Sequence, residues 1–141
     1  MTSPKEKLKD KLQMRSEFDE YAKNYQEKIE QSIGLFGQKH DFFVENKIEH
    51  LTHAFSQIGA LENMKILDVG CGIGLGHHKL SSYFNELHGV DVSSESINLA
   101  KKKNERVKYK VYDGDQLPFE DNSFDGVYAI CVLHHVPKDK W

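Results

Sequence analysis

The glycine-rich stretch at residues 65–76, KILDVGCGIGLG, constrains the fold of this chain more than any other part of the sequence. Residues 66–69 are apolar apart from Asp68, and such a short run is typical of a strand that is buried on both faces. Glycines follow at positions 70, 72, 74 and 76, and the pattern then predicts a helix from about residue 75 to 84. A strand, a glycine-rich turn and a helix form a cradle for a small ligand, because glycine lets the backbone approach closely and a helix start offers free N–H groups.

The spacing of these glycines argues against a dinucleotide as the ligand. In the dinucleotide fingerprint G-x-G-x-x-G, the third glycine would fall at Leu75 when counted from Gly70 and at His77 when counted from Gly72. Neither position is a glycine. Asp68 would also repel a pyrophosphate, whereas a carboxylate suits a ligand that carries an amine. One half of an NAD-dependent oxidoreductase is therefore the less favoured alternative.

Helical and extended patterns alternate along the rest of the chain. Helices are predicted at residues 16–33, 39–58 and 93–103, and strands at residues 87–92, 107–112 and 126–132. This alternation predicts an α/β fold with a doubly wound, mainly parallel sheet. We divide the chain into an N-terminal helical region, residues 1–60, and a ligand-binding domain, residues 61–141.

Capping residues and apolar spacing give the expected details of the helices. The first helix should begin at Ser16 after a frayed tail or a solvated helix start, the second should end at Gly59, and the third should begin at Ser93 or Ser94. The residues of the second helix expected to point inward are Phe43, Ile48, Leu51, Phe55 and Ile58.

Acidic residues follow the two predicted strands after the glycine-rich loop. Asp91 lies about twenty residues after Gly70, where an α/β nucleotide site places the carboxylate that accepts two ribose hydroxyls. The alternative is an Asp that only caps a helix or a turn. Asp115 ends the next strand in the segment GDQLPF, and a carboxylate beside a backbone N–H can bind the amine and ring nitrogen of adenine.

The motifs DVGCGIG and GDQLPF, followed by NSFD and LHHV, resemble those of class I S-adenosylmethionine (SAM) dependent methyltransferases that act on small molecules. The resemblance implies a Rossmann-like sheet with strand order 3-2-1-4 of a seven-stranded core, SAM as cofactor, S-adenosylhomocysteine as product and a small-molecule methyl acceptor. It assigns cofactor binding to Asp68, Gly70, Cys71, Gly72, Gly74, Asp91, Val92, Asp115 and Gln116. The chain departs from the family at Ile73, where a Thr or Ser is frequent.

Two further groups of residues are candidates for the site. The N-terminal segment F-D-x-x-A-x-x-Y, from Phe18 to Tyr25, resembles helices that fold over the active site of such enzymes as a lid, and Tyr21 or Tyr25 would then line the pocket; Tyr25 is our candidate cofactor contact. The alternative is an ordinary core stripe. His134 and His135 follow the fourth strand, and either could be a general base if the acceptor is a hydroxyl; otherwise both are structural.

Composition limits the partners. The net charge of −3 gives no reason to expect nucleic acid or an anionic membrane, and no apolar run is long enough to cross a bilayer. The N-terminal segment MTSPKEKLKDKL lacks the apolar core of a signal peptide. Cys71 and Cys131 lie far apart without metal-ligand spacing, so we expect free thiols, no metal and a cytoplasmic location. His50 and His53 are interpreted as surface or interface residues.

The chain supplies four strands and then ends at Trp141. The fourth strand would be a long apolar edge, so we expect either a fragment of a longer enzyme or self-association through that strand. A SAM-binding module without turnover is the alternative to an enzyme.

Overall fold

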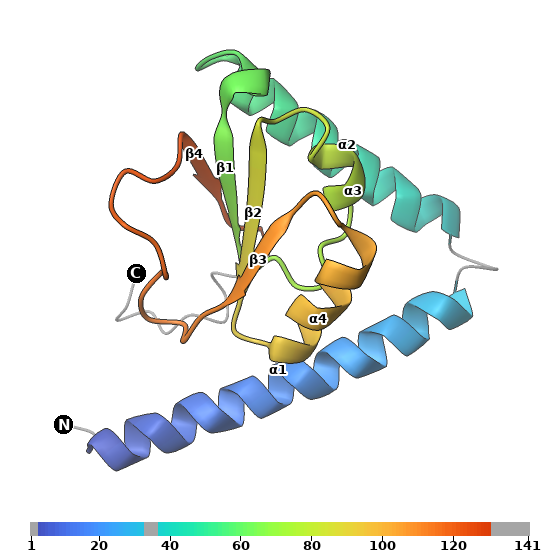
Figure 1. Cartoon of the computed structure of the whole chain (residues 1–141). Helices are drawn as coiled ribbons and strands as arrows, with labels where there is room; N and C mark the ends of the chain where they lie inside the picture. The colour runs from blue at the N-terminus through green and yellow to red at the C-terminus, as the bar shows by residue number, and fades with distance from the viewer. Residues whose placement is uncertain (1–2, 33–36, 131–141) are drawn as a thin grey trace.

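The computed structural model of the chain describes residues 3–32 and 37–130. Four parallel strands form one sheet: β1 (Lys65–Val69), β2 (Glu86–Asp91), β3 (Lys108–Val111) and β4 (Gly126–Tyr128). The helices are α1 (Pro4–Ser32), α2 (Gly37–Ser56), α3 (His77–Leu80) and α4 (Ser94–Lys103), with a short 3₁₀ helix, η1, at Leu61–Asn63. The strand order is β3-β2-β1-β4, which confirms the predicted order 3-2-1-4 (Figure 1).

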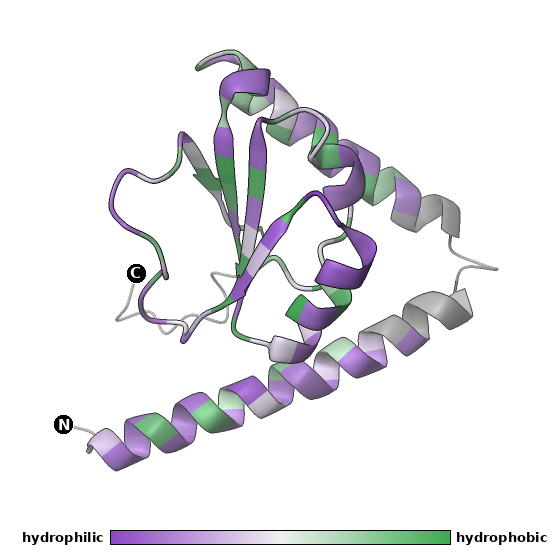
Figure 2. Cartoon of the chain, viewed as in Figure 1, coloured by the Kyte–Doolittle hydropathy of each residue, from purple (hydrophilic) through white to green (hydrophobic). Residues whose placement is uncertain are grey.

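The core lies between the sheet and helices α2, α3 and α4. Ile66 and Leu67 of β1 are almost fully buried, as the apolar run predicted. Figure 2 shows apolar residues gathered along β1 and β2, while α1 is largely hydrophilic. The main buried side chains around them are Ile48, Phe55, Leu80, Phe84, Leu87, Ile97 and Tyr109. Sheet and helices thus share one core, and the loop after β1 lies at the edge of it.

Helix α1 begins much earlier than predicted. Ser16 lies inside it and is not an N-cap; the cap is Ser3, whose hydroxyl accepts from Glu6 N at 3.2 Å while the Glu6 carboxylate accepts from Ser3 N at 2.7 Å. This reciprocal pair is a capping box. Of the two alternatives for the lysine-rich start, the solvated helix start is confirmed and the frayed tail is wrong. The available signal was local, a serine at position 3 followed by Glu6.

Two inward-facing predictions on the second helix are wrong. Ile48 and Phe55 are buried as expected, but Phe43 is 59% exposed and Ile58, beyond the end of α2, is 66% exposed. The helix ends at Ser56 rather than at Gly59. Phe43 precedes Ile48 by five residues, more than one helical turn, so it lies on a different face of the helix, and Ile58 follows the last helical residue.

The helix after the glycine-rich loop is short. It spans His77–Leu80, with Gly76 in a left-handed conformation as its N-cap, and not residues 75–84. The loop consumes the residues up to 76, and turns replace the helix after Leu80. By contrast, Ser93 caps α4 as predicted, because its hydroxyl accepts from Ser96 N at 3.1 Å.

Strand β4 is the outer strand of the described sheet. It covers Gly126–Tyr128 of the predicted 126–132, and Val127 is 54% exposed. Its pairing with β1 is extended by Asp125, whose backbone N donates to Lys65 O at 2.8 Å and whose side chain accepts from Lys65 N at 2.7 Å. Self-association through this strand stays a prediction.

Candidate functional site

The glycine-rich loop lies at the carboxyl end of the sheet, where the chain crosses from β1 to neighbours on either side (Figure 1). Such a switch point is where open α/β sheets bind ligands. The N–H groups of Gly70 and Cys71 both donate to Val90 O, at 2.8 and 3.0 Å, and Gly72 N donates to Asp91 Oδ2 at 2.8 Å. The first half of the loop is therefore fixed to the end of β2.

The two inner glycines of the loop face different surroundings. Both have a left-handed backbone, with φ of +55° at Gly72 and +69° at Gly74. A Cβ on Gly74 would lie 2.5 Å from the Tyr109 hydroxyl, whereas a Cβ on Gly72 would meet no atom of the described residues within 4 Å. The loop thus packs against the protein at Gly74 and leaves open space beside Gly72.

Asp91 ends β2, as predicted, and is 9% exposed. Its Oδ1 accepts from Ser93 N at 2.9 Å and its Oδ2 from Gly72 N at 2.8 Å. Burial raises the pKa of this carboxyl, and the two backbone N–H groups oppose that rise. The backbone N–H of Val92 also acts on this carboxylate. A carboxylate has about four acceptor positions, so acceptor capacity remains for a ligand hydroxyl. The neighbouring Val92, also a predicted contact, is half-buried and offers its carbonyl to Arg15 of α1 at 3.1 Å.

Asp68, the acid before the loop, belongs to a buried polar cluster. It is 2% exposed, and its Oδ2 accepts from His77 Nε2 at 2.8 Å and lies 3.9 Å from Lys47 Nζ. On the other side of the ring, His77 Nδ1 lies 2.7 Å from the Tyr109 hydroxyl. We call Lys47, Asp68, His77, Tyr109 and Tyr128 the Asp68 cluster. Sequence reasoning missed its other four members, because they come from four different elements.

Cys71 lies in the same loop as a buried, free thiol. Burial, followed by the charges of Asp68 and Asp91, raises its pKa well above the usual range. The thiol is therefore protonated and a poor nucleophile at neutral pH. Cys71 therefore contributes to the site by packing in the core.

Asp115 and Gln116 lie in the loop after β3, four and five residues beyond the strand end, and not at the end of the strand itself. Their backbone N–H groups both donate to Asp113 Oδ1, at 2.9 and 3.0 Å. These two bonds, the one from Gln116 first, lower the pKa of the Asp113 carboxyl to about 2. The N–H that was assigned to adenine thus already has a partner within the chain.

Helix α1 contributes contacts that the sequence did not reveal. Lys11 Nζ lies 2.5 Å from Asp115 Oδ2 and 3.3 Å from Asp113 Oδ2, and Asp19 Oδ1 accepts from Ser93 Oγ at 2.5 Å and from Glu95 N at 3.3 Å. With Arg15, these residues recur every four positions along α1, and that spacing was the available signal. The helix therefore lies along the segments that follow β2 and β3 (Figure 1).

Tyr25, the candidate contact on α1, is half-buried, and its ring stacks on that of Tyr21 at 5.7 Å. Burial raises the pKa of its hydroxyl. Tyr21 is 64% exposed, while Ala22 of the same segment is buried. The segment therefore packs through Ala22, and the lid role stays a prediction.

His134, His135 and Cys131 lie outside the described residues. Within the described ranges no group of three or more His, Cys, Asp or Glu side chains could hold a metal ion, and His50 hydrogen-bonds to Asn46 O at 2.8 Å. No helix in the described part is long and apolar enough to cross a membrane.

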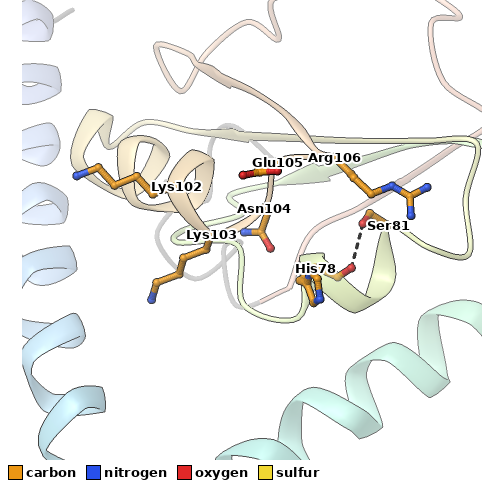
Figure 3. A pocket seen from close by; sticks show the side chains of 7 residues that line it. All are labelled: His78, Ser81, Lys102, Lys103, Asn104, Glu105 and Arg106. Atoms are coloured by element: carbon orange, nitrogen blue, oxygen red, sulfur yellow. Dashed lines mark hydrogen bonds between the residues drawn. The ribbon is translucent and has the colours of Figure 1, made fainter.

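A hollow of about 280 Å³ lies elsewhere, beside α3 and the turn from α4 to β3 (Figure 3). It is lined by His78, Ser81, Lys102, Lys103, Asn104, Glu105 and Arg106. None of the predicted site residues lines this hollow, so it is separate from the loop and from Asp91.

The sheet order and the glycine-rich loop at the switch point define a Rossmann-like α/β domain. A family model described as a methyltransferase domain matches residues 67–141, and the chain belongs to this family. The crystal structure of magnesium protoporphyrin IX methyltransferase from Synechocystis PCC 6803 with bound SAM has the same fold: its TM-score is 0.68 at 22% identity, over 92% of this chain and 65% of that one. These findings confirm the resemblance seen in the motifs.

Curated relatives carry several acceptor names. Phosphoethanolamine N-methyltransferase 2 of Caenorhabditis elegans is 38% identical over 78 residues, 51% of this chain and 18% of the relative. Sterol 24-C-methyltransferase erg-4 of Neurospora crassa is 34% identical over 104 residues, 68% of this chain and 27% of the relative. The chain thus spans about a fifth to a quarter of the length of these two relatives.

Proposed function

We propose that the chain is a SAM-dependent methyltransferase, or part of one, that transfers a methyl group to a small molecule. The observation that carries the proposal is Asp91, a buried carboxylate at the end of β2 that is bonded to the loop N–H of Gly72 and keeps acceptor capacity for a ligand hydroxyl. Membership in the methyltransferase-domain family supports it.

Each part of SAM has candidate partners in this proposal. The open side of the loop at Gly72 receives the methionyl part and Asp68 faces its amine, while Asp91 binds the ribose hydroxyls. The segment at Asp115 and Gln116 lies beside adenine, and the N–H of Gln116 would have to leave Asp113 to donate to the base. The sulfonium methyl is already activated, so the protein mainly positions the acceptor in line with it. The remaining candidates, Gly70, Cys71, Gly74, Val92 and Tyr25, shape the cradle, and His134 or His135 would supply a base.

The acceptor stays a small molecule without a narrower assignment. One relative is named for an N-methylation and the other for a C-methylation, although both match this part of the chain. The shared part therefore serves the cofactor in this proposal, and the acceptor is chosen elsewhere. The free thiol of Cys71 supports a reducing, cytoplasmic setting.

Calorimetric titration of the chain with SAM, S-adenosylhomocysteine and NAD tests the cofactor. We expect the first two to bind and Asp91→Asn to weaken both by about tenfold or more, because it removes a charged acceptor. Asp121→Asn, which changes an exposed carboxylate, is the matched control and should bind as the parent does. Preference for NAD would overturn the proposal.

Methyl transfer from labelled SAM separates an enzyme from a module without turnover. Phosphoethanolamine and a sterol are the first acceptors to test, with this chain and with a form extended beyond residue 141. If neither these two acceptors nor a wider set of small amines, alcohols and activated carbons takes up label, the result would favour a binding module without turnover.

A further inference from the structure

Apart from Asp68 itself, the Asp68 cluster consists of polar side chains to which the proposed function gives no role. His77 is fully buried at the start of α3, directly after the glycine-rich loop, and its ring is stacked on Tyr109 with centroids 5.7 Å apart and planes 9° apart. Tyr128 of β4 lies 3.4 Å from His77 Nε2, through its hydroxyl. The cluster therefore joins the loop to β1, β3, β4 and α2.

The protons in this cluster follow from its donors and acceptors. An ionised Asp68 can only accept, so the bond between its Oδ2 and His77 Nε2 requires a proton on Nε2. Burial raises the pKa of Tyr109 far above its usual range, so its hydroxyl is protonated and can donate to His77 Nδ1. The Tyr109 hydroxyl thus occupies Nδ1 and holds the ring with Nε2 directed at Asp68.

The contacts of Asp68 are unequal at its two oxygens. Both the hydrogen bond from His77 and the ion pair with Lys47 fall on Oδ2. Neither contact needs Oδ1. Tyr128 also hydrogen-bonds to the Asp68 carboxylate. At Oδ2 the carboxylate is anchored to the protein by His77 and Lys47, and its negative charge can serve a cation beside the loop.

From this arrangement we infer that His77 is a positioning residue, which holds Asp68 in the orientation that binds the cofactor's ammonium group. The inference rests on the proposed function. Its energetic basis is that a carboxylate which is 2% exposed is expensive to keep ionised unless it is paired and hydrogen-bonded. Without the Nε2 donor, Asp68 would rotate toward Lys47, and the ammonium would lose its partner.

The test compares ligands that have the ammonium group with one that lacks it. SAM and S-adenosylhomocysteine carry the amino acid end, whereas 5′-methylthioadenosine has the adenosine and the sulfur but no ammonium. His77→Asn should weaken the first two by about tenfold, the size of one hydrogen bond to a charged group, and leave 5′-methylthioadenosine within twofold. His77→Gln, whose amide reaches the place of Nε2, should restore most of the loss.

Two further variants separate positioning from general support of the fold. His78→Asn changes the exposed neighbour on the same helix and should bind all three ligands as the parent does. In an Asp68→Asn background, His77→Asn should add little to the loss of SAM affinity, because it acts through Asp68. Tyr109→Phe keeps the stacked ring and should show the same ligand selectivity, and it carries the test if His77→Asn does not fold.

Several results would overturn the inference. If His77→Asn lowers the affinity for all three ligands equally, His77 is a general structural residue. If it lowers none of the three affinities, His77 has no role in binding. A full loss on top of Asp68→Asn would mean that His77 acts without Asp68. Failure of the parent chain to bind SAM would refute the proposed function itself, and that result differs from all the others.

Discussion

Replacing Gly72 and Gly74 separately by alanine tests how the glycine-rich loop is built. Both residues have a positive φ, which costs an alanine about 1 kcal/mol. At Gly74 the new Cβ would also lie 2.5 Å from the Tyr109 hydroxyl, 2.8 Å from Asn104 Nδ2 and 3.3 Å from Ala100 Cβ. At Gly72 it would meet nothing among the described residues within 4 Å.

The atoms around Gly74 cannot move aside at low cost. Asn104 Nδ2 is held by Ala100 O at 3.0 Å and by Gly74 O at 3.3 Å, and the Tyr109 hydroxyl is held by His77. Overpacking of this kind costs about 1–3 kcal/mol, so Gly74→Ala should lower the free energy of unfolding by about 2–4 kcal/mol in total. Gly72→Ala should lower it by about 1 kcal/mol.

Ligand affinity should show the opposite order where the fold survives. The open space beside Gly72 is where the proposed cofactor approaches the backbone, so a methyl group there should weaken SAM binding although the protein stays folded. Urea unfolding followed by circular dichroism measures stability, and calorimetry measures affinity. Equal stabilities for the two variants would refute the packing argument, and unchanged SAM affinity in Gly72→Ala would refute the open-side argument.

Two further predictions concern the segments that hold the site. Ser93→Ala should lower the free energy of unfolding by about 1 kcal/mol, since Ser93 caps α4 and donates to Asp19, whereas the exposed Ser94→Ala should change it little; urea unfolding of both variants measures the difference. The pKa of the Asp113 carboxyl, measured by carbon NMR, should be about 2, below the usual value of 3.8, because the carboxylate accepts from two backbone N–H groups. Its stabilising effect is therefore present above about pH 4 and is lost as the pH falls toward 2, and a midpoint near 3.8 would contradict the observed contacts.

The sequence was sufficient for the parts of the fold that depend on a local pattern. The apolar run at residues 66–69 is typical of a strand that is buried on both faces. Asp91 could be placed because the carboxyl ends of parallel strands meet at one edge of a sheet. Ser93 was recognisable as a cap because it precedes an acidic first turn. Each of these signals lies within a few residues of the feature that it predicts.

Features that depend on contacts between distant segments could not be predicted in this way. The reach of Lys11 to Asp115 spans more than one hundred residues. The short α3 reflects the residues consumed by the loop. In each case tertiary packing, rather than local propensity, decides the outcome.

The Asp68 cluster shows why stability alone does not explain the site. Apolar side chains of similar volume in place of a buried ion pair are frequently neutral or stabilising, whereas removal of one partner leaves a costly unpaired charge. Asp68, His77 and Lys47 therefore depend on one another, because removing one leaves another buried polar group without its partner. None of the three adds apolar packing to the core. The Asp68 carboxylate is buried beside the glycine-rich loop, where an apolar side chain would pack at least as well. A function at that loop accounts for the carboxylate more directly than packing does. The affinity lost on disturbing the cluster should thus be specific to the charged end of the ligand, while the loss of stability follows from whichever partner is left unpaired.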